Sequence, residues 1–238
     1  MKRKTIFNIL ANSALFLALI AISLVSFMPT TGAPKTQTAS ARLLAIYEGN
    51  RNSNKVSLMI NVYWGTEYIQ PMLNVLKEKN VSTTFFVGGS WAVNNEELVK
   101  KIQADGHEIA NHGYNHKNHE NLSKEANISE ILACHVAVKS VLGKDMDLFA
   151  PPSGAYSDAT ISAATSLGYK TIMWSKDTID WRDHNTSLIV SRATNNAKGG
   201  DLVLMHPTAN TLEALPQIIK ILQQKGLVIA PVSSVLEP

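Results

Sequence analysis

The sequence predicts an α/β protein in which parallel strands curl into an incomplete or distorted seven-stranded (β/α) barrel. Short apolar runs alternate with amphipathic stretches from Lys55 to the C-terminus, and this is the pattern of βα units that share a parallel sheet. Seven or so of these units occupy fewer than two hundred residues. Polar residues directly follow several of the runs, at the carboxyl ends of the strands, where active sites lie in barrels of this class.

The first half of this region contains three predicted strands. The run VSLMI at 56–60 is apolar throughout, as expected for a strand that is buried on both faces. The run TTFFVGG at 83–89 is rich in β-branched and aromatic residues, and HEIAN at 107–111 gives the third strand. Between them, apolar residues recur with helical spacing at 66–79 and at 96–105.

The second half begins with the longest predicted helix. It starts at Ser123, a good N-cap residue, and runs to Leu142, where Gly143 ends it. Further apolar runs predict strands at 148–150, 170–174, 201–206 and 227–232. The stretches between these runs predict helices at 157–167, 186–197 and 211–225. Strands and helices therefore alternate to the end of the chain.

An uncharged and mostly apolar stretch at 5–32 follows a cluster of basic residues at the N-terminus. About 20 apolar residues suffice to cross a bilayer, and the basic flank is expected to stay in the cytoplasm. A cleaved signal peptide and an uncleaved signal anchor both fit, and Pro34 favours the anchor because it makes a poor cleavage site. We therefore expect a signal peptide or anchor at 1–29, a flexible linker at 30–54 and a domain at 55–238. The domain would lie outside the cell membrane or be secreted to the cell wall.

The composition excludes some classes of partner. The formal net charge is only +3, and no basic stripe interleaved with aromatic residues runs along the chain, so we expect no nucleic-acid partner. The single cysteine, Cys134, cannot form an internal disulfide. Because it lies in the apolar pattern of a helix, we expect a buried and unreactive thiol.

Two histidines in the stretch NHGYNH, His112 and His116, directly follow the third predicted strand. Four residues apart on one turn of backbone, two imidazoles can face the same way and share a metal ion. The pair alone is a weak signal, because most such histidines lie on the surface or have other partners. Other predicted strand ends carry further candidates, namely Asn61, Pro151, Asp177, Asp180 and His206. Their shared place at the carboxyl ends of strands strengthens the prediction of a metal site.

The order of five motifs resembles that of the polysaccharide deacetylase family, also called carbohydrate esterase family four or the NodB homology domain. The motifs are INVYWG at 60–65, NHGYNH at 111–116, APPSGAY at 150–156, DTIDW at 177–181 and LVLMH at 202–206. The resemblance covers nearly all of the domain, and the WG after the first strand is similar to the subgroup associated with spore walls. It implies a seven-stranded barrel and a hydrolase that removes acetyl groups from cell-wall or chitin-like glycans.

The resemblance also implies a cofactor and catalytic roles. A divalent metal, usually zinc, is held in this family by two histidines and an aspartate, and His112 and His116 would be those histidines here. His206 would be the general acid for the leaving group. Asp177 would be the carboxylate that holds and orients His206.

The same resemblance implies a groove for the acetyl group and the sugar. Trp181 and the turn made by Pro151 and Pro152 would shape this groove. Trp64 is open to two interpretations, because an aromatic ring at the rim of a barrel can pack against the protein or stack on a sugar. The implied partner is a cell-wall glycan, and the N-terminal segment adds contact with the membrane.

Two of the motifs depart from the pattern of the family. Where the family has two adjacent aspartates, a general base and a metal ligand, this chain has Asn61 and Val62. The arginine that pairs with the base is replaced by Ala150, so the base side is lost as a unit and no buried charge is left unpaired. His119 could supply a third metal ligand if it faces the same ion, although a solvent-exposed histidine is the simpler interpretation.

Two functions therefore remain open. The first is an exported, metal-dependent deacetylase for amino sugars of peptidoglycan or a related polysaccharide, impaired because Asn61 stands at the base position and an amide cannot take a proton from water. The second is a catalytically inactive glycan-binding protein of the cell wall or spore surface. Loss of a general base costs about 10²–10⁴-fold in rate, which leaves room for a slow enzyme, and we favour the first.

Overall fold

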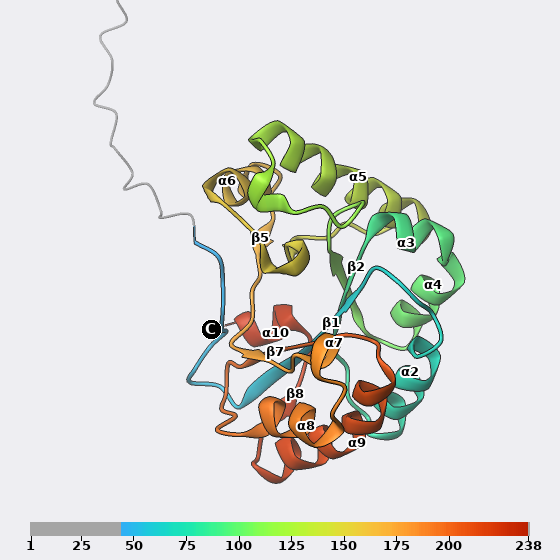
Figure 1. Cartoon of the computed structure of the whole chain (residues 1–238), viewed down its shortest axis with the longest axis vertical. Helices are drawn as coiled ribbons and strands as arrows, with labels where there is room; N and C mark the ends of the chain where they lie inside the picture. Colours follow the sequence, from blue (N-terminus) through green and yellow to red (C-terminus); the bar gives the residue numbers. More distant parts are fainter. Residues whose placement is uncertain (1–43, 238) are drawn as a thin grey trace, which may run out of the picture. The chain divides into compact units, whose positions relative to one another are not determined.

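The computed structural model describes residues 44–237, and Figure 1 shows how their helices and strands are arranged. The predicted signal segment at 1–29 lies outside the described residues, as does the first part of the predicted linker. Within the described part of the chain, no helix combines the length and the apolar character that a membrane span requires. The export signal therefore stays a prediction.

The described strands form one sheet in which all neighbouring strands are parallel. They are β1 (Lys55–Val62), β2 (Thr84–Val87), β3 (Glu108–Asn111), β4 (Leu148–Phe149), β5 (Lys170–Thr171), β6 (Lys176–Asp177), β7 (Leu202–Met205) and β8 (Val228–Ile229). Their order is β5-β4-β3-β2-β1-β7-β6, and β8 pairs with β1 outside this path. In the described residues β5 and β6 do not pair with each other, so the predicted α/β fold with an incomplete parallel barrel is confirmed.

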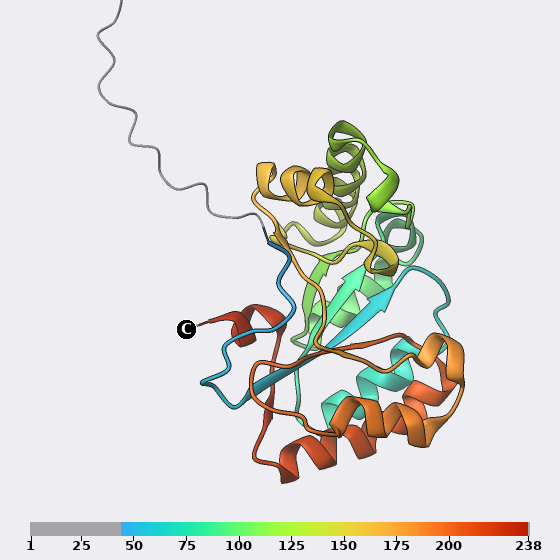
Figure 2. The same ribbon diagram turned by 60° about the vertical axis from the view of Figure 1, so that its left-hand side comes forward.

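Most of the helices lie along the outside of the curled sheet, as Figures 1 and 2 show, whereas the last one, α10 (Val232–Leu236), packs on its inner face. The helices are α2 (Ile69–Glu78), α3 (Gly89–Asn94), α4 (Glu96–Ala104), α5 (Lys124–Leu142), α6 (Asp158–Ser166), α7 (Asp180–Asp183), α8 (Thr186–Thr194), α9 (Ala209–Gln224) and α10, with short turns of 3₁₀ helix at η1 (His119–Asn121) and η2 (Pro152–Gly154). The longest begins as predicted, because the Ser123 hydroxyl accepts the Ala126 N–H, and Gly143 ends it in a left-handed conformation.

Side chains on the two faces of β1 reach two separate hydrophobic cores, because successive residues of a strand point to opposite faces. Ile60 and Val62 pack in an outer core between the sheet and the helices. Met59 packs in an inner core inside the barrel, to which α10 also contributes. Asn61 follows on the same face as Met59, so the strand brings its side chain to the end of the barrel interior.

The fifth strand is shorter than its apolar run predicts. Only Lys170 and Thr171 pair with β4. The next residues pair with the N-terminal side of the domain instead, since Ile172 forms a bridge with Ile46, and the Met173 N–H donates to the Ile46 carbonyl at 2.7 Å. β6 then begins a separate pairing with β7. The described sheet has eight strands in place of the seven predicted.

Residues 44–54 form what we call the N-terminal arm, so the prediction of a flexible linker at 30–54 is wrong for these residues. The arm pairs with the chain after β5 through Ile46, and with the start of β7 through an antiparallel bridge between Glu48 and Asp201. Arg51 in the arm donates to the buried Asp201 carboxylate at 2.6 Å. In Figure 2 the arm is the blue segment that leads into β1. Backbone pairing and the ion pair of Arg51 therefore hold the arm against the domain.

Candidate active-site cleft

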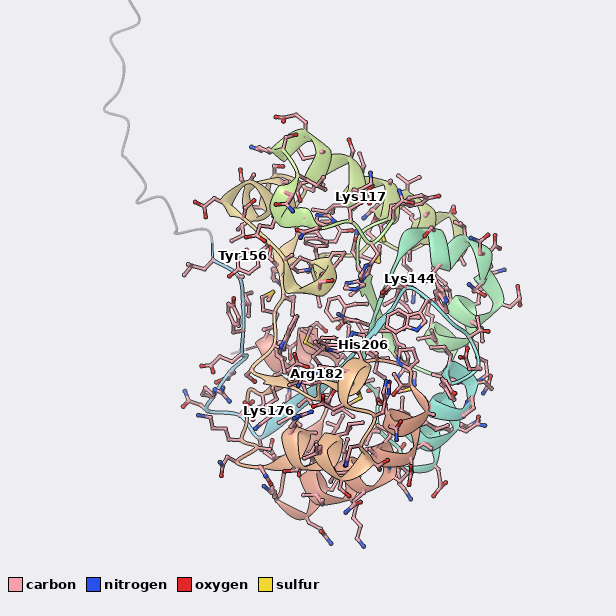
Figure 3. The ribbon with its side chains drawn as sticks, viewed as in Figure 1. Lys117, Lys144, Tyr156, Lys176, Arg182 and His206 are labelled. Carbon is pink, nitrogen blue, oxygen red and sulfur yellow. The ribbon has the colours of Figure 1, made fainter. Side chains whose placement is uncertain are left out.

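A cleft of about 350 Å³ lies at the carboxyl ends of the strands. The residues that line it come mainly from the loops after β1, β3, β4, β6 and β7, and they are Asn61, Tyr63, Trp64, His112, His116, Ser153, Gly154, Trp174, Asp177, Trp181, Leu204 and His206. Five of the predicted residues, from four strand ends, thus come together in one place: Asn61, His112, His116, Asp177 and His206. In Figure 3 the labelled His206 lies near the middle of the ribbon, between its upper and lower halves.

The loop after β3 holds the two predicted metal histidines and is fixed at both ends. The side-chain oxygen of Asn111 accepts the Gly113 N–H at 2.9 Å, which turns the chain directly after the strand. Further along, the Glu130 carboxylate of α5 accepts the backbone N–H groups of residues 114–115 and pairs with the Lys117 ammonium at 2.8 Å. The loop is therefore tied to both the sheet and α5.

The rings of His112 and His116 lie with their centres 5.1 Å apart, although no helical turn joins them. Gly113 and His116 adopt left-handed backbone angles, with φ values of 72° and 53°, and these bends bring the rings together. The Nδ1 atom of His112 donates to the Ala150 carbonyl at 2.8 Å, which leaves Nε2 as an acceptor. Burial lowers the pKa of His112 to about 3 and that of His116 to about 4. Both rings are therefore neutral near pH 7.

Asp180, and not Asp177, is the carboxylate that holds His206, so the predicted pairing is wrong. One oxygen of Asp180 accepts from His206 Nδ1 at 2.8 Å, and the other accepts the His206 backbone N–H and the Thr211 hydroxyl, both at 2.6 Å. Asp177 lines the cleft, but its carboxylate accepts the Ile179 N–H. The reason is a left-handed turn at Ile179, with a φ of 53°, which separates the two aspartates.

Asn61 lies near the end of β1 with only 3% of its surface exposed. Its side-chain oxygen is buried and has no hydrogen-bond partner among the described residues. The neighbouring Val62 is fully buried in the outer core. Because an unpaired buried acceptor costs free energy, the Asn61 oxygen is available to a ligand that can donate a hydrogen bond.

Aromatic rings form much of the wall of the cleft. The Tyr63 ring stacks on His116, with ring centres 3.4 Å apart and an angle of 18° between the planes. Trp64 stacks over His206 with ring centres 5.7 Å apart, and Trp181 is 54% exposed and also lines the cleft. The placement of the two tryptophans agrees with the predicted groove. The sequence does not predict the contact of Tyr63 with His116. Its only indication is that Tyr63 directly follows a strand.

Pro151 and Pro152 are buried and are not among the residues that line the cleft, so their role in substrate binding stays a prediction. They form the buried base of the η2 turn, and the next two residues, Ser153 and Gly154, reach the cleft. A side chain at Gly154 would meet the Trp174 ring at 2.5 Å, so glycine allows this ring to approach. Trp174 also lines the cleft, and its place at the end of the fifth predicted strand is the signal that could have identified it.

His119 lies in the interior and is not the exposed histidine that the sequence suggests. Its side chain is buried, and its Nδ1 atom is 2.7 Å from the side-chain oxygen of Asn127. Its Nε2 atom lies close to Gly113, where an added side chain would meet it at 2.9 Å. His119 is not among the residues that line the cleft. It therefore packs against the loop and does not complete a set of metal ligands.

The donor set of the cleft does not fit the zinc centre that the family resemblance implies. His112 and His116 offer two neutral imidazoles, and catalytic zinc sites have three protein ligands. Within residues 44–237, no three His, Cys, Asp or Glu side chains are grouped closely enough to hold an ion. Asn61, which lines the same cleft, offers only the oxygen of an uncharged amide. The role of the two histidines as metal ligands therefore stays a prediction, because the described residues offer no third ligand beside them.

Several known proteins resemble this chain in sequence or in fold. A family model described as polysaccharide deacetylase matches residues 48–172. The uncharacterized protein YlxY of Bacillus subtilis is 36% identical over 204 residues, which are 86% of this chain but only 64% of that protein. A peptidoglycan-N-acetylglucosamine deacetylase of Bacillus cereus is 35% identical over 175 residues, which are 71% of this chain and 82% of that relative.

A solved structure with a similar fold is that of BA3943 from Bacillus anthracis, described as a CE4 family pseudoenzyme. It matches with a TM-score of 0.79 and 34% identity, over 82% of this chain and 69% of that chain. A mutant of BA3943 with restored enzymatic activity matches with the same TM-score and 32% identity, over 82% of this chain and 71% of that chain. The family match over more than half of the sequence and the 35% identical deacetylase lead to one conclusion. This chain belongs to the polysaccharide deacetylase family, a family of carbon–nitrogen hydrolases that also includes the pseudoenzyme BA3943.

Proposed function

We propose that this protein binds an acetylated amino sugar of peptidoglycan, or of a related cell-wall polysaccharide, in the cleft, and that its deacetylase activity is severely impaired. The observation that carries the proposal is the buried side-chain oxygen of Asn61, which has no hydrogen-bond partner among the described residues. It stands where the family resemblance puts the general base. An amide oxygen accepts hydrogen bonds, but it cannot take a proton from water at neutral pH.

The chemistry of the cleft suits an N-acetylated sugar. The Asn61 oxygen and the Nε2 atom of neutral His112 are both acceptors, whereas the acetamido N–H and the sugar hydroxyls are donors. The exposed faces of Trp64 and Trp181 can pack on the apolar face of a pyranose ring. An acetyl ester has no N–H to offer the two acceptors, so this arrangement favours an N-acetyl over an O-acetyl group.

The acid side of the site is retained, which supports a slow hydrolytic activity. Asp180 accepts the Nδ1 proton of His206, so the Nε2 atom remains free to exchange a proton with a leaving amine. The base side has no such group. A missing general base costs about 10²–10⁴-fold in rate. We therefore expect the rate of acetate release to be lower by at least about 10²-fold than that of a family member that has both aspartates.

A glycan-binding protein with no turnover is the second candidate. It is favoured by the donor set around His112 and His116, which does not fit a zinc centre, and by the Tyr63 ring that stacks on His116. The similarity to BA3943, which is described as a pseudoenzyme, supports the same candidate.

We also propose that the protein acts outside the cytoplasm. The basic N-terminus and the apolar stretch at 5–32 have the composition of a signal peptide or signal anchor. The named relatives include peptidoglycan deacetylases, whose substrate is the cell wall. Digestion of the domain by a protease added to cells without their wall tests this location, and full protection of the domain argues against it.

The central test is a comparison of the wild type with Asn61→Asp. Bound zinc is measured by elemental analysis, binding of N-acetylglucosamine oligomers by calorimetry, and acetate release by a coupled assay. We expect the wild type to bind the oligomers while holding less than one equivalent of zinc and releasing little acetate. The new carboxylate would stand at the general-base position and could take a proton from water, so Asn61→Asp should release acetate at least about tenfold faster.

Asn118→Asp is the matched control, because it adds the same charge at an exposed position outside the cleft, in the segment that follows β3. It should behave like the wild type in all three measurements. Acetate release by the wild type at the level of an intact family member would contradict the impairment. Failure of the wild type to bind any oligomer would contradict glycan binding.

A further inference from the structure

Two tyrosines meet near the cleft, and only one of them belongs to a deacetylase motif: Tyr156 ends the motif at 150–156, whereas Tyr47 lies outside all five. Tyr47 lies in the N-terminal arm, and Tyr156 lies between η2 and α6; their hydroxyl oxygens are 2.7 Å apart. Tyr47 is 46% exposed and Tyr156 is half-buried. The shared hydrogen bond raises the pKa of Tyr47 to about 12, so the Tyr47 hydroxyl keeps its proton near pH 7.

Neither tyrosine lines the cleft itself, but each lies a few residues along the chain or one hydrogen bond away from residues that do. Tyr156 comes two residues after Gly154, which lines the cleft, and two residues span at most about 7 Å. On the arm side, the carbonyl of Ile46 accepts the Met173 N–H at 2.7 Å, next to Trp174, which lines the cleft as well. Figure 3 shows the labelled Tyr156 beside the upper part of the arm. The two tyrosines therefore border the rim that Gly154 and Trp174 form.

Holding the arm in place does not require exposed aromatic rings at this point. Ile46 already packs against the inner core, and its backbone makes hydrogen bonds with the chain after β5. The ion pair of Arg51 with Asp201 holds the arm a few residues later. What the tyrosines add is an exposed apolar ring with hydroxyl groups at its edge. Aromatic rings with a polar edge are suited to a ligand that is apolar on one face and polar around its rim.

We infer that Tyr47 and Tyr156 form an outer sugar-binding subsite, so that the ligand is a chain of several sugars that runs from the cleft across the N-terminal arm. This inference rests on the proposed function, because it extends the same glycan site. One sugar occupies the cleft near Asn61, and a later sugar of the chain stacks on the tyrosine pair. Polymeric glycan is then preferred over a single acetylated sugar.

The test is the dependence of affinity on chain length, measured by calorimetry with N-acetylglucosamine oligomers from the monosaccharide to the hexasaccharide. The full chain, purified in detergent, is compared with Tyr47→Ala, Tyr156→Ala, Tyr47→Phe and the control Leu44→Ala, which removes an exposed aliphatic side chain from the same arm. For the wild type we expect affinity to rise with length. Each alanine variant should lose about three- to tenfold in affinity for the longest oligomers and nothing for the shortest that binds.

Tyr47→Phe separates a sugar platform from a structural contact. It keeps the ring and removes the hydrogen bond to Tyr156, so a platform predicts nearly normal binding of long oligomers. Equal weakening by Tyr47→Ala at every oligomer length, together with a lower melting temperature, would overturn the inference and assign the pair to anchoring of the arm. Binding of short oligomers with no gain from length would overturn only the subsite. No binding by the wild type would overturn the subsite and the proposed function together.

Discussion

The carboxylate of Asp180 contacts three donors at the base of the cleft, which are the backbone N–H and the ring Nδ1 of His206 and the hydroxyl of Thr211. Asp177 lies three residues earlier with an identical side chain, so the motif DTIDW does not indicate which of the two reaches His206. The choice depends on the left-handed turn at Ile179, a conformation that isoleucine disfavours and that the sequence therefore does not signal. The sequence therefore predicts that an aspartate holds His206, but it does not tell which of the two aspartates does so.

Asp180→Asn should lower the free energy of unfolding by about 3 kcal/mol, because one donor around this buried side chain would face an NH₂ group in place of an oxygen. Asp177→Asn is the matched control. Asp177 is partly exposed and accepts one backbone N–H, which an amide oxygen can also accept, so its loss should stay below about 1 kcal/mol. Urea denaturation measures both values, and equal losses would contradict the role given to Asp180.

At the scale of elements, the loop after β3 brings His112 and His116 together by a route that the sequence reveals only in part. Asn111 and Gly113 are residue types that favour turns, and because they lie at the end of the strand they indicate a sharp bend there. The contact of Glu130 with the loop joins α5 to residues 15 and 16 positions earlier. No local pattern indicates such a contact, so the closeness of the histidines could be predicted while its cause could not.

The N-terminal arm is an element whose composition resembles that of a linker. Its backbone nevertheless pairs with Thr171 and Gly200 through Ile46 and Gly49, which lie more than one hundred positions away in the sequence. Contacts over such separations leave no periodic pattern in a short segment. Composition alone therefore places the start of the domain at Lys55, after the arm.

The ion pair between the arm and the sheet provides a test of this packing. Arg51→Met should lower the free energy of unfolding by about 3 kcal/mol, because the buried Asp201 carboxylate would lose its cationic partner. Glu48→Gln removes the other, exposed partner of the same arginine and should cost clearly less, because solvent screens that pair. Chemical denaturation of both variants gives the comparison. A small loss for Arg51→Met would mean that the arm contributes little to stability.

At the scale of the described domain, the alternation of apolar runs predicts a parallel sheet and the end of the sheet where the cleft lies, because these patterns are local. The curled but open sheet agrees with that prediction. The parts that could not be predicted all join distant segments: the arm on the open side, the short fifth strand and the Tyr63 ring on His116. The same division holds in the cleft, where the strand ends indicate its residues but not their mutual contacts.

Because the arm packs on the open side of the barrel, we expect the stable domain to begin at or before Leu44 and not at Lys55. A chain that begins at Lys55 loses the pairing of Ile46 and leaves Asp201 buried without its arginine. A buried charge that loses its partner costs about 3–5 kcal/mol, and 1 kcal/mol shifts the melting temperature of a domain of this size by about 2–4 °C. The shorter chain should therefore melt about 10 °C below a chain that begins at Leu44.

Hydrogen exchange distinguishes this local effect from a general loss of structure. Without the arm, the Met173 N–H has lost its acceptor, the Ile46 carbonyl, and should exchange faster. The amides of β2 should keep their protection, since β2 pairs with β1 on one side and β3 on the other. Equal melting temperatures for the two chains, with unchanged exchange at Met173, would mean that the barrel holds its open edge without the arm and that the domain begins at Lys55 after all.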